Sequence, residues 1–212
     1  RDLGGFFNHV WTINPIATAA YDQSVRSPTR PSWFQLSPSS TFVEGALAVA
    51  PRLNSWPGGS ALNFLLSQAH QIRQMVRIAR AHPLTVVRGG DPLYAGLFAL
   101  MVARMSSRPL VIRVGGNNDR VSRETGRPIM PRLFRKRSLE RVIERLVLSR
   151  ADAVMGAKEE NLSWEVGSGA SRHRSRVVRY CNLIDPLLFR HPDERSTSRL
   201  TLDAIGSRSG TG

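Results

Sequence analysis

The sequence lacks most of the features that would assign it quickly to a class. It has a single cysteine, Cys181, so neither an intrachain disulfide nor a cysteine-based zinc site can form. No apolar run reaches about 18 residues, which argues against a transmembrane helix. The N-terminus has no apolar signal-peptide core, and we therefore expect a cytoplasmic protein.

Several catalytic and cofactor motifs are also missing. There is no G-x-x-x-x-G-K-[ST] phosphate loop, no G-x-G-x-x-G after a strand and no G-x-S-x-G nucleophile turn. The five histidines are scattered without metal-ligand spacing. We expect no bound metal and no tightly bound cofactor.

Acidic residues are few. The chain of 212 residues carries 30 Lys and Arg against 16 Asp and Glu, a net charge of +14. Such a surface attracts nucleic acid, anionic lipid or phosphorylated small molecules. Only Lys136 and Lys158 are lysines, so we attribute most of the arginine excess to codon usage in a GC-rich genome. The charge therefore narrows the partners only weakly.

What the sequence does have is an alternation of strand and helix patterns. The expected strands are residues 9–13, 41–44, 84–87, 109–114, 153–156 and 177–180. The expected helices are residues 60–81, 93–105, 131–150 and 158–166, the first capped by Ser60. Apolar residues of that first helix recur at steps of three and four and so form one face. They are Leu62, Leu65, Leu66, Ala69, Ile72, Val76 and Ala79.

This alternation predicts the fold class. Apolar strands separated by helices indicate βαβ units and a parallel sheet covered on both faces. We therefore expect an α/β protein with a Rossmann-like, doubly wound parallel sheet as one domain over residues 1–190. Residues 18–40 are expected to form a long loop, and residues 191–212, rich in Ser, Thr, Arg and Gly, a disordered tail.

Two glycine-rich loops follow neighbouring strands of the expected sheet. Ligands of open parallel sheets bind at the carboxyl ends of the strands, so both loops are candidate substrate-binding segments. They contain Arg88, Gly89, Gly90 and Asp91, and Gly115, Gly116, Asn117, Asn118 and Asp119. Asp91 has an alternative role as a helix cap, and Asn117 to Asp119 an alternative as a turn.

The segment 120–150 carries ten basic and three acidic residues. Apolar positions at helical spacing place its second half against the sheet. Its exposed face is either an ordinary solvated arginine-rich surface or a patch for anionic lipid head groups or a phosphorylated acceptor. The candidate patch residues are Arg132, Arg135, Lys136 and Arg137. Nucleic acid is not favoured, because no recognised nucleic-acid-binding module is visible in the sequence.

An ordered set of segments resembles the N-terminal domain of GT-B glycosyltransferases of family 4. The segments are LTVVRGGDPLYAGLFALMVAR (84–104), PLVIRVGGNNDR (109–120), RADAVMGAKEENLSWEVG (150–167), VVRYCNLIDPLLF (177–189) and FFNHVWTINP (6–15). Asn182, Asp185 and Phe189 match the pattern that closes this domain in the family, and Asn182 is a further candidate for substrate binding.

The resemblance implies half of a GT-B fold that supplies the acceptor side of a retaining glycosyltransferase. The family's first strand–loop–helix unit and its donor-binding domain with the E-x7-E pair have no counterpart here, and the histidine often found at the positions of Arg88 or Gly90 is missing. We expect a fragment that is inactive alone, with a nucleotide-sugar donor for the complete enzyme.

The resemblance implies a class of acceptor, and the residues leave one alternative function open. The expected acceptor is a sugar acceptor, lipid-linked or phosphorylated, reached from the inner face of the membrane. The alternative is a non-catalytic Rossmann-like module that binds an anionic ligand or a membrane surface.

Overall fold

The computed structural model describes residues 7–16, 31–46, 50–82, 85–131, 133–156, 159–170 and 177–179. The chain divides into two units, Arg1–Tyr180 and Cys181–Gly212, and every described residue belongs to the first. The candidate residue Asn182 and the tail expected at 191–212 therefore lie outside the described residues, as does Arg132.

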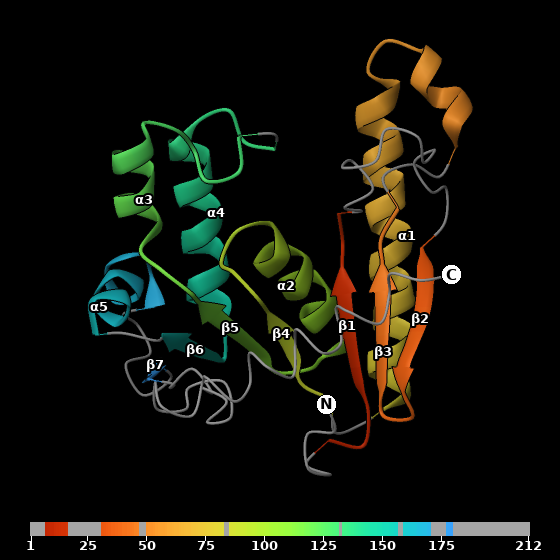
Figure 1. The fold of residues 1–212 in the computed structure, drawn as a ribbon, viewed down its shortest axis with the longest axis horizontal. Helices are drawn as coiled ribbons and strands as arrows, with labels where there is room; N and C mark the ends of the chain where they lie inside the picture. Colours follow the sequence, from red (N-terminus) through yellow and green to blue (C-terminus); the bar gives the residue numbers. More distant parts are fainter. Residues whose placement is uncertain are drawn as a thin grey trace, which may run out of the picture. The chain divides into compact units, whose positions relative to one another are not determined.

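The second half of the first unit contains a four-stranded parallel sheet (Figure 1). Its strands are β4 (Val87–Gly89), β5 (Leu110–Val114), β6 (Ala153–Gly156) and β7 (Val177–Arg179), and they lie side by side in chain order. All three pairings are parallel. This mixed α/β arrangement is compatible with a Rossmann-like fold.

A separate three-stranded sheet lies in the N-terminal part. In it β1 (Val10–Asn14) pairs in parallel with β3 (Ser40–Glu44), and β2 (Ser32–Ser37) pairs antiparallel with β3. The described strands thus form two sheets rather than the single parallel sheet that we expected. The expectation of a loop throughout 18–40 is wrong for β2, where a short aromatic run turns back at Pro38–Ser39 to pair with β3.

Helices follow the strands of the larger sheet. They are α2 (Tyr94–Ser106), α3 (Asn118–Thr125), α4 (Arg137–Arg150) and α5 (Glu159–Gly167). The short α3 was not expected, and α4 begins six residues after the expected start at Pro131. Asn117 caps α3, and Gly126, with a φ of 65°, ends it, so the segment expected to lead directly into α4 is divided.

The apolar core has two clusters. In the first, alternate residues of β5, namely Leu110, Ile112 and Val114, are at most 1% exposed and pack with residues of α2 and α4. In the second, Val43 of β3 packs with residues of α1 (Gly59–Ala81) and α2, including Ile72 and Phe98. The contact between α1 and α2 thus lies within a core that includes residues of both sheets' strands.

The expected apolar face of α1 is only half correct. Ile72, Val76 and Ala79 are buried, as expected. The four earlier positions are exposed instead, and we call them the leucine ridge: Leu62, Leu65, Leu66 and Ala69.

The buried side of the same half of α1 is polar. Asn63, Ser67 and Gln71 are at most 1% exposed and follow one another at steps of four. They bond to the segment that follows β3, whose backbone groups need hydrogen-bond partners. Asn63 bonds both the N–H and the carbonyl of Ala50, and Gln71 donates to the carbonyl of Ala46. The hydrogen bonds to these backbone groups thus explain why the buried face of this half of α1 is polar.

The expected capping of this helix is also wrong. Gly58, with a φ of 75°, stands at the N-cap of α1, and no side chain bonds the helix start there. A left-handed backbone favours glycine at this position, and Ser60 lies inside the helix.

Candidate functional site

The two candidate loops leave the sheet at one edge. β4 and β5 are adjacent and parallel, with Gly89 opposite Ile112. Their carboxyl ends therefore point the same way, and the segments after Gly89 and after Val114 both begin there. The two loops nevertheless have different surroundings.

The first loop is engaged in building the fold. A Cβ added to Gly89 would lie 2.7 Å from Cδ1 of Ile112 and 3.0 Å from Cα of Gly96, so glycine lets α2 pack closely on the sheet. Asp91 Oδ1 accepts a hydrogen bond of 2.7 Å from the N–H of Leu93 just before α2. Burial raises the pKa of Asp91, against the lowering effect of backbone N–H groups at the start of that helix. Asp91 thus takes the capping role, while Arg88 and Gly90 are exposed.

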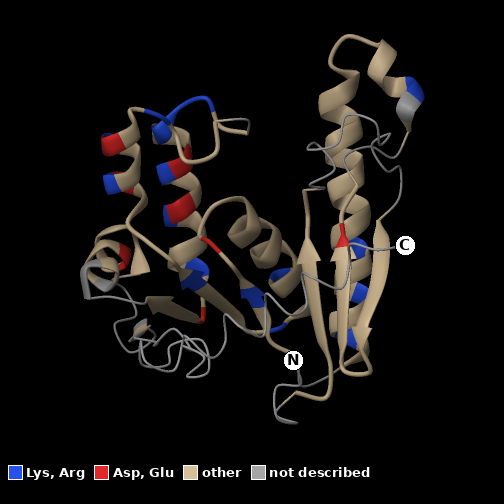
Figure 2. Ribbon diagram, in the orientation of Figure 1, with Lys and Arg blue, Asp and Glu red and all other residues tan. Residues whose placement is uncertain are grey.

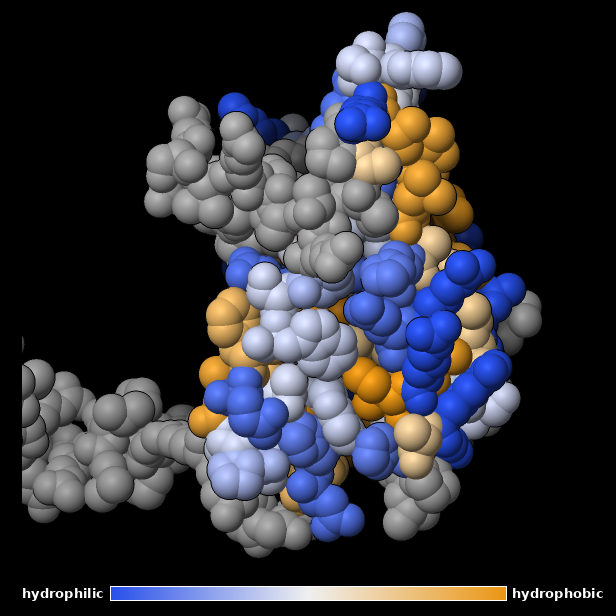
Figure 3. All heavy atoms as spheres, turned by 90° about the vertical axis from the view of Figure 1, so that its right-hand side faces the viewer, coloured by the Kyte–Doolittle hydropathy of each residue, from blue (hydrophilic) through white to orange (hydrophobic). Residues whose placement is uncertain are grey.

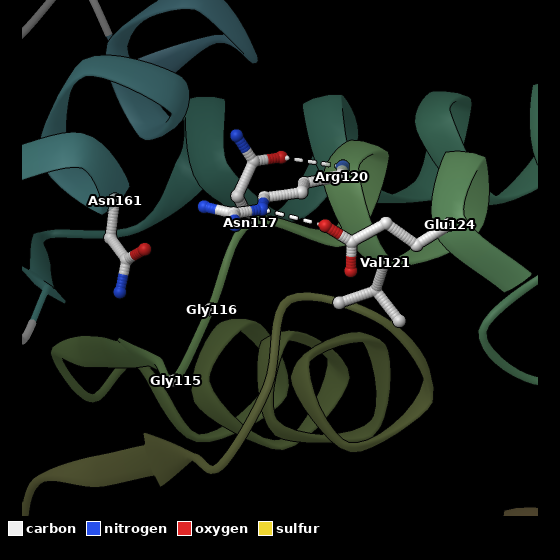
Figure 4. A pocket seen from close by; sticks show the side chains of 7 residues that line it. All are labelled: Gly115, Gly116, Asn117, Arg120, Val121, Glu124 and Asn161. Carbon is white, nitrogen blue, oxygen red and sulfur yellow. Dashed lines mark hydrogen bonds and ion pairs between the residues drawn. The ribbon is translucent and has the colours of Figure 1, made fainter.

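The second loop borders a cavity of about 320 Å³ (Figure 4). Three elements contribute to it: the end of β5, helix α3 and helix α5. The lining residues are Gly115, Gly116, Asn117, Arg120, Val121, Glu124 and Asn161. A Cβ added to Gly115 or Gly116 would meet no atom within 4 Å, so the backbone there faces open space.

Helix α3 is fixed against this loop by its cap. Oδ1 of Asn117 accepts hydrogen bonds from the N–H groups of Asp119 at 3.0 Å and Arg120 at 3.1 Å. Arg120 in turn pairs with Glu124 at 2.8 Å along one side of the cavity. The charges of the cavity lining therefore balance, and its polar groups are a backbone loop, an ion pair and amide side chains.

Asn161 on α5 lies across the cavity from α3 (Figure 4). Asn161 is only 5% exposed, and its carboxamide forms no hydrogen bond with the other labelled residues that line the cavity. A carboxamide that lines a cavity offers two donors and an acceptor to a ligand there. Sequence reasoning missed Asn161, because it sits in a polar helical run with nothing to distinguish it from its neighbours.

Arg137 at the start of α4 bonds to three carboxylates. All its guanidinium N–H groups are engaged: two on Glu144, two on Asp119 and one on Glu140, at 2.7–3.2 Å. Glu140 also accepts the backbone N–H groups of Ile129 and Met130. This network ties α3, α4 and the loop between them into one unit.

The rest of the second loop belongs to the same network. Asn118 donates to Glu144 at 2.7 Å, and Asp119 accepts from Arg141 and from Nε1 of Trp164 on α5. Burial would raise the pKa of Asp119, but the bonds from Arg141, Trp164 and Arg137 outweigh it and hold that pKa below its usual value. Asn118 and Asp119 therefore position the cavity wall rather than line the cavity.

The members of the expected anion patch have different surroundings. The side chain of Arg137 is 13% exposed, and all its donors bond to carboxylates. Burial would lower its pKa, but the bonds and charges of Glu144, Glu140 and Asp119 outweigh that and raise it. Arg135 and Lys136 are exposed on the loop before α4.

Glu165 is a second buried polar group on α5. It is fully buried, and neither carboxylate oxygen has a hydrogen-bond partner among the described residues. Burial raises the pKa of Glu165 to about 7. Its carboxyl group is one turn of helix beyond Asn161, and it is not part of the cavity lining.

Comparison with known proteins assigns no family to this arrangement: no protein-family model matches the chain, and no curated protein matches it. Within the described residues, no cluster of three His, Cys, Asp or Glu side chains could hold a metal ion. Likewise, none of the described helices has the length and apolar character needed to cross a membrane.

Proposed function

We propose that the cavity at the carboxyl end of β5 binds a neutral, hydroxylated acceptor, and that the chain is the acceptor-side domain of a GT-B glycosyltransferase. The observation that carries the proposal is the carboxamide of Asn161, a residue only 5% exposed that lines the cavity across from α3. An amide offers two donors and an acceptor, the set that pairs with sugar hydroxyl groups.

The cavity's position supports the same proposal. Open backbone at Gly115 and Gly116 lets a ligand approach closely at the carboxyl edge of a parallel sheet, the usual ligand edge of such sheets. The sequence segments that resemble family 4 include this strand, this loop and helix α5. In that family the donor contacts lie in a second domain, so we expect this chain alone to bind an acceptor and to transfer no sugar.

The charge balance of the cavity separates this function from the alternative of an anion-binding module. Among the lining residues, the single arginine, Arg120, is paired with Glu124 at 2.8 Å. An incoming phosphate would meet the Glu124 carboxylate beside the arginine, whereas a neutral hydroxyl group can bond to both. The cavity therefore favours an uncharged ligand.

The test is ligand-observed NMR with a panel of neutral sugars and their phosphates. Saturation transfer to at least one neutral sugar, lost in Asn161→Ala and kept in the exposed control Asn8→Ala, is expected. Binding of phosphates only would favour the anion-binding alternative instead. Sugar transfer by the isolated chain in a turnover assay would contradict the expectation that it is inactive alone.

A further inference from the structure

The leucine ridge of α1 is an exposed apolar strip on a regular helix. Leu62, Leu65 and Leu66 are 50%, 63% and 46% exposed, and Ala69 continues the same face. Positions at steps of three and four lie on one side of a helix, so these side chains form a continuous strip. Trp56, 72% exposed, lies just before the start of the helix.

The ridge is fixed in place by the polar face on the other side of the helix. Asn63 holds Ala50 through two hydrogen bonds of 2.9 Å, and Gln71 and Ser67 hold Ala46. Rotating α1 to bury the leucines would break these bonds and bury the amides without partners, which costs free energy. The leucines are therefore held outward by the fold.

Basic residues extend the same side of the helix. Arg73 and Arg77 are exposed on the following turns, and Arg52 is exposed on the short helix η2 (Pro51–Ser55) that precedes α1. No described residue forms an ion pair with Arg52, Arg73 or Arg77. Figure 3 shows an orange, hydrophobic patch at the height of the N-terminal half of α1, with blue, hydrophilic residues below it.

The local charge of this surface has one sign. From Gly45 to Gly90 the sequence has no Asp or Glu. Figure 2 shows only blue residues along η2 and α1, while α3 and α4 mix blue and red. By contrast, Arg137 of the patch expected before α4 pairs with Asp119, Glu140 and Glu144. The excess positive charge is therefore better exposed along α1 than at the start of α4.

We propose that α1 docks on an anionic membrane surface, with Leu62, Leu65 and Leu66 entering the acyl–headgroup boundary and Arg52, Arg73 and Arg77 contacting lipid phosphates. Aliphatic side chains next to unpaired arginines, without carboxylates, match the chemistry of such a surface. A protein partner of ordinary composition would need an acidic rim around an apolar groove. The inference does not depend on the cavity beside Asn161, and its test is separate.

The test is co-sedimentation of the full chain with vesicles of phosphatidylcholine containing phosphatidylglycerol, and with vesicles of phosphatidylcholine alone. We expect binding to the anionic vesicles, weakened by salt. L62Q/L65Q/L66Q should weaken it on the order of 100-fold, since three half-exposed leucines lose their burial. The matched control L139Q/V142Q removes exposed apolar side chains from α4 and should leave binding unchanged.

A charge series gives a second, independent readout. R73Q/R77Q should weaken binding on the order of tenfold and reduce its salt dependence, whereas R135Q/K136Q should do neither. The proposal is overturned if the wild type does not bind anionic vesicles, or if L62Q/L65Q/L66Q binds them as well as the wild type does. It is also overturned if the wild type is a dimer that L62Q/L65Q/L66Q converts to a monomer, because a second copy would then cover the ridge.

Discussion

Arg137 and Glu144 meet through two parallel hydrogen bonds, from Nη1 to Oε1 at 2.8 Å and from Nη2 to Oε2 at 2.7 Å. The pair is buried, and through Asn118 and Asp119 it holds the loop that forms one wall of the cavity. The arginine-rich start of α4, which in the sequence suggests an anion-binding face, thus serves at this residue to build the fold.

Arg137→Met should therefore lower the free energy of unfolding by about 3–5 kcal/mol, because it leaves buried carboxylates without their cation. Arg141→Met removes an exposed arginine from the same Asp119 and should cost less than about 1 kcal/mol. Urea denaturation of both variants measures the difference. Equal, small losses would mean that the network contributes little.

The ionisation of Glu165 should make the free energy of unfolding fall as the pH rises. Its pKa is about 7 in the folded chain against the ordinary value of 4.5, so the unfolded chain loses its proton first. The folded state is then penalised progressively between about pH 4.5 and pH 7, and fully above that window.

Glu165→Gln removes this penalty. It should raise the free energy of unfolding by about 1–3 kcal/mol at pH 8 and leave it nearly unchanged at pH 4. Denaturation curves of the variant and the wild type at both pH values give the comparison. A variant that is equally stabilised at both values would assign the effect to packing rather than to ionisation.

The reversed burial of α1 predicts opposite results on its two sides. Asn63→Ala should cost about 2–3 kcal/mol, since it leaves the N–H of Ala50 without its partner and removes one of the two donors to the Ala50 carbonyl. Leu66→Ala, on the ridge, should cost less than about 1 kcal/mol. Thermal denaturation of both variants distinguishes them. A larger loss for Leu66→Ala would place the ridge in the core.

The two glycine loops should also respond differently. Gly89→Ala should destabilise the chain by about 1–3 kcal/mol, because its Cβ would lie 2.7 Å from Ile112. Gly115→Ala has room for its Cβ and should leave stability unchanged, but it should weaken ligand binding by narrowing the cavity mouth. Paired stability and binding measurements test this. Weakened binding in Gly89→Ala at unchanged stability would assign the first loop to the ligand instead.

Sequence patterns predict much of the fold because apolar runs mark strands wherever helices cover a sheet. The strands at 109–114 and 153–156 and the helix at 60–81 correspond closely to β5, β6 and α1. The pattern failed where burial depends on what a helix packs against. The leucines of α1 keep the period of a buried face, yet the loops behind the helix need hydrogen-bond donors, so the amide side is buried.

The candidate site divides in the same way. Glycine pairs after two strands predict that both loops lie at one edge of the sheet, and the parallel pairing of β4 and β5 places them there. Whether a given loop residue caps, packs or faces open space depends on atoms far away in the chain: Ile112 for Gly89, Glu144 for Asn118. Asn161 had no signal in the sequence, because its significance comes from a cavity formed by three separate elements.

The most direct test of the account is an NMR titration of the isotope-labelled chain with the neutral sugars. The readout is the side-chain amide signals of its asparagines and the backbone signals of Gly115 and Gly116. We expect saturable shifts of the Asn161 amide and of the Gly115 and Gly116 backbone signals, absent in Asn161→Ala. Sugars that bind while leaving these three signals unmoved, or a panel in which no neutral sugar shifts them, would contradict an acceptor site at this cavity.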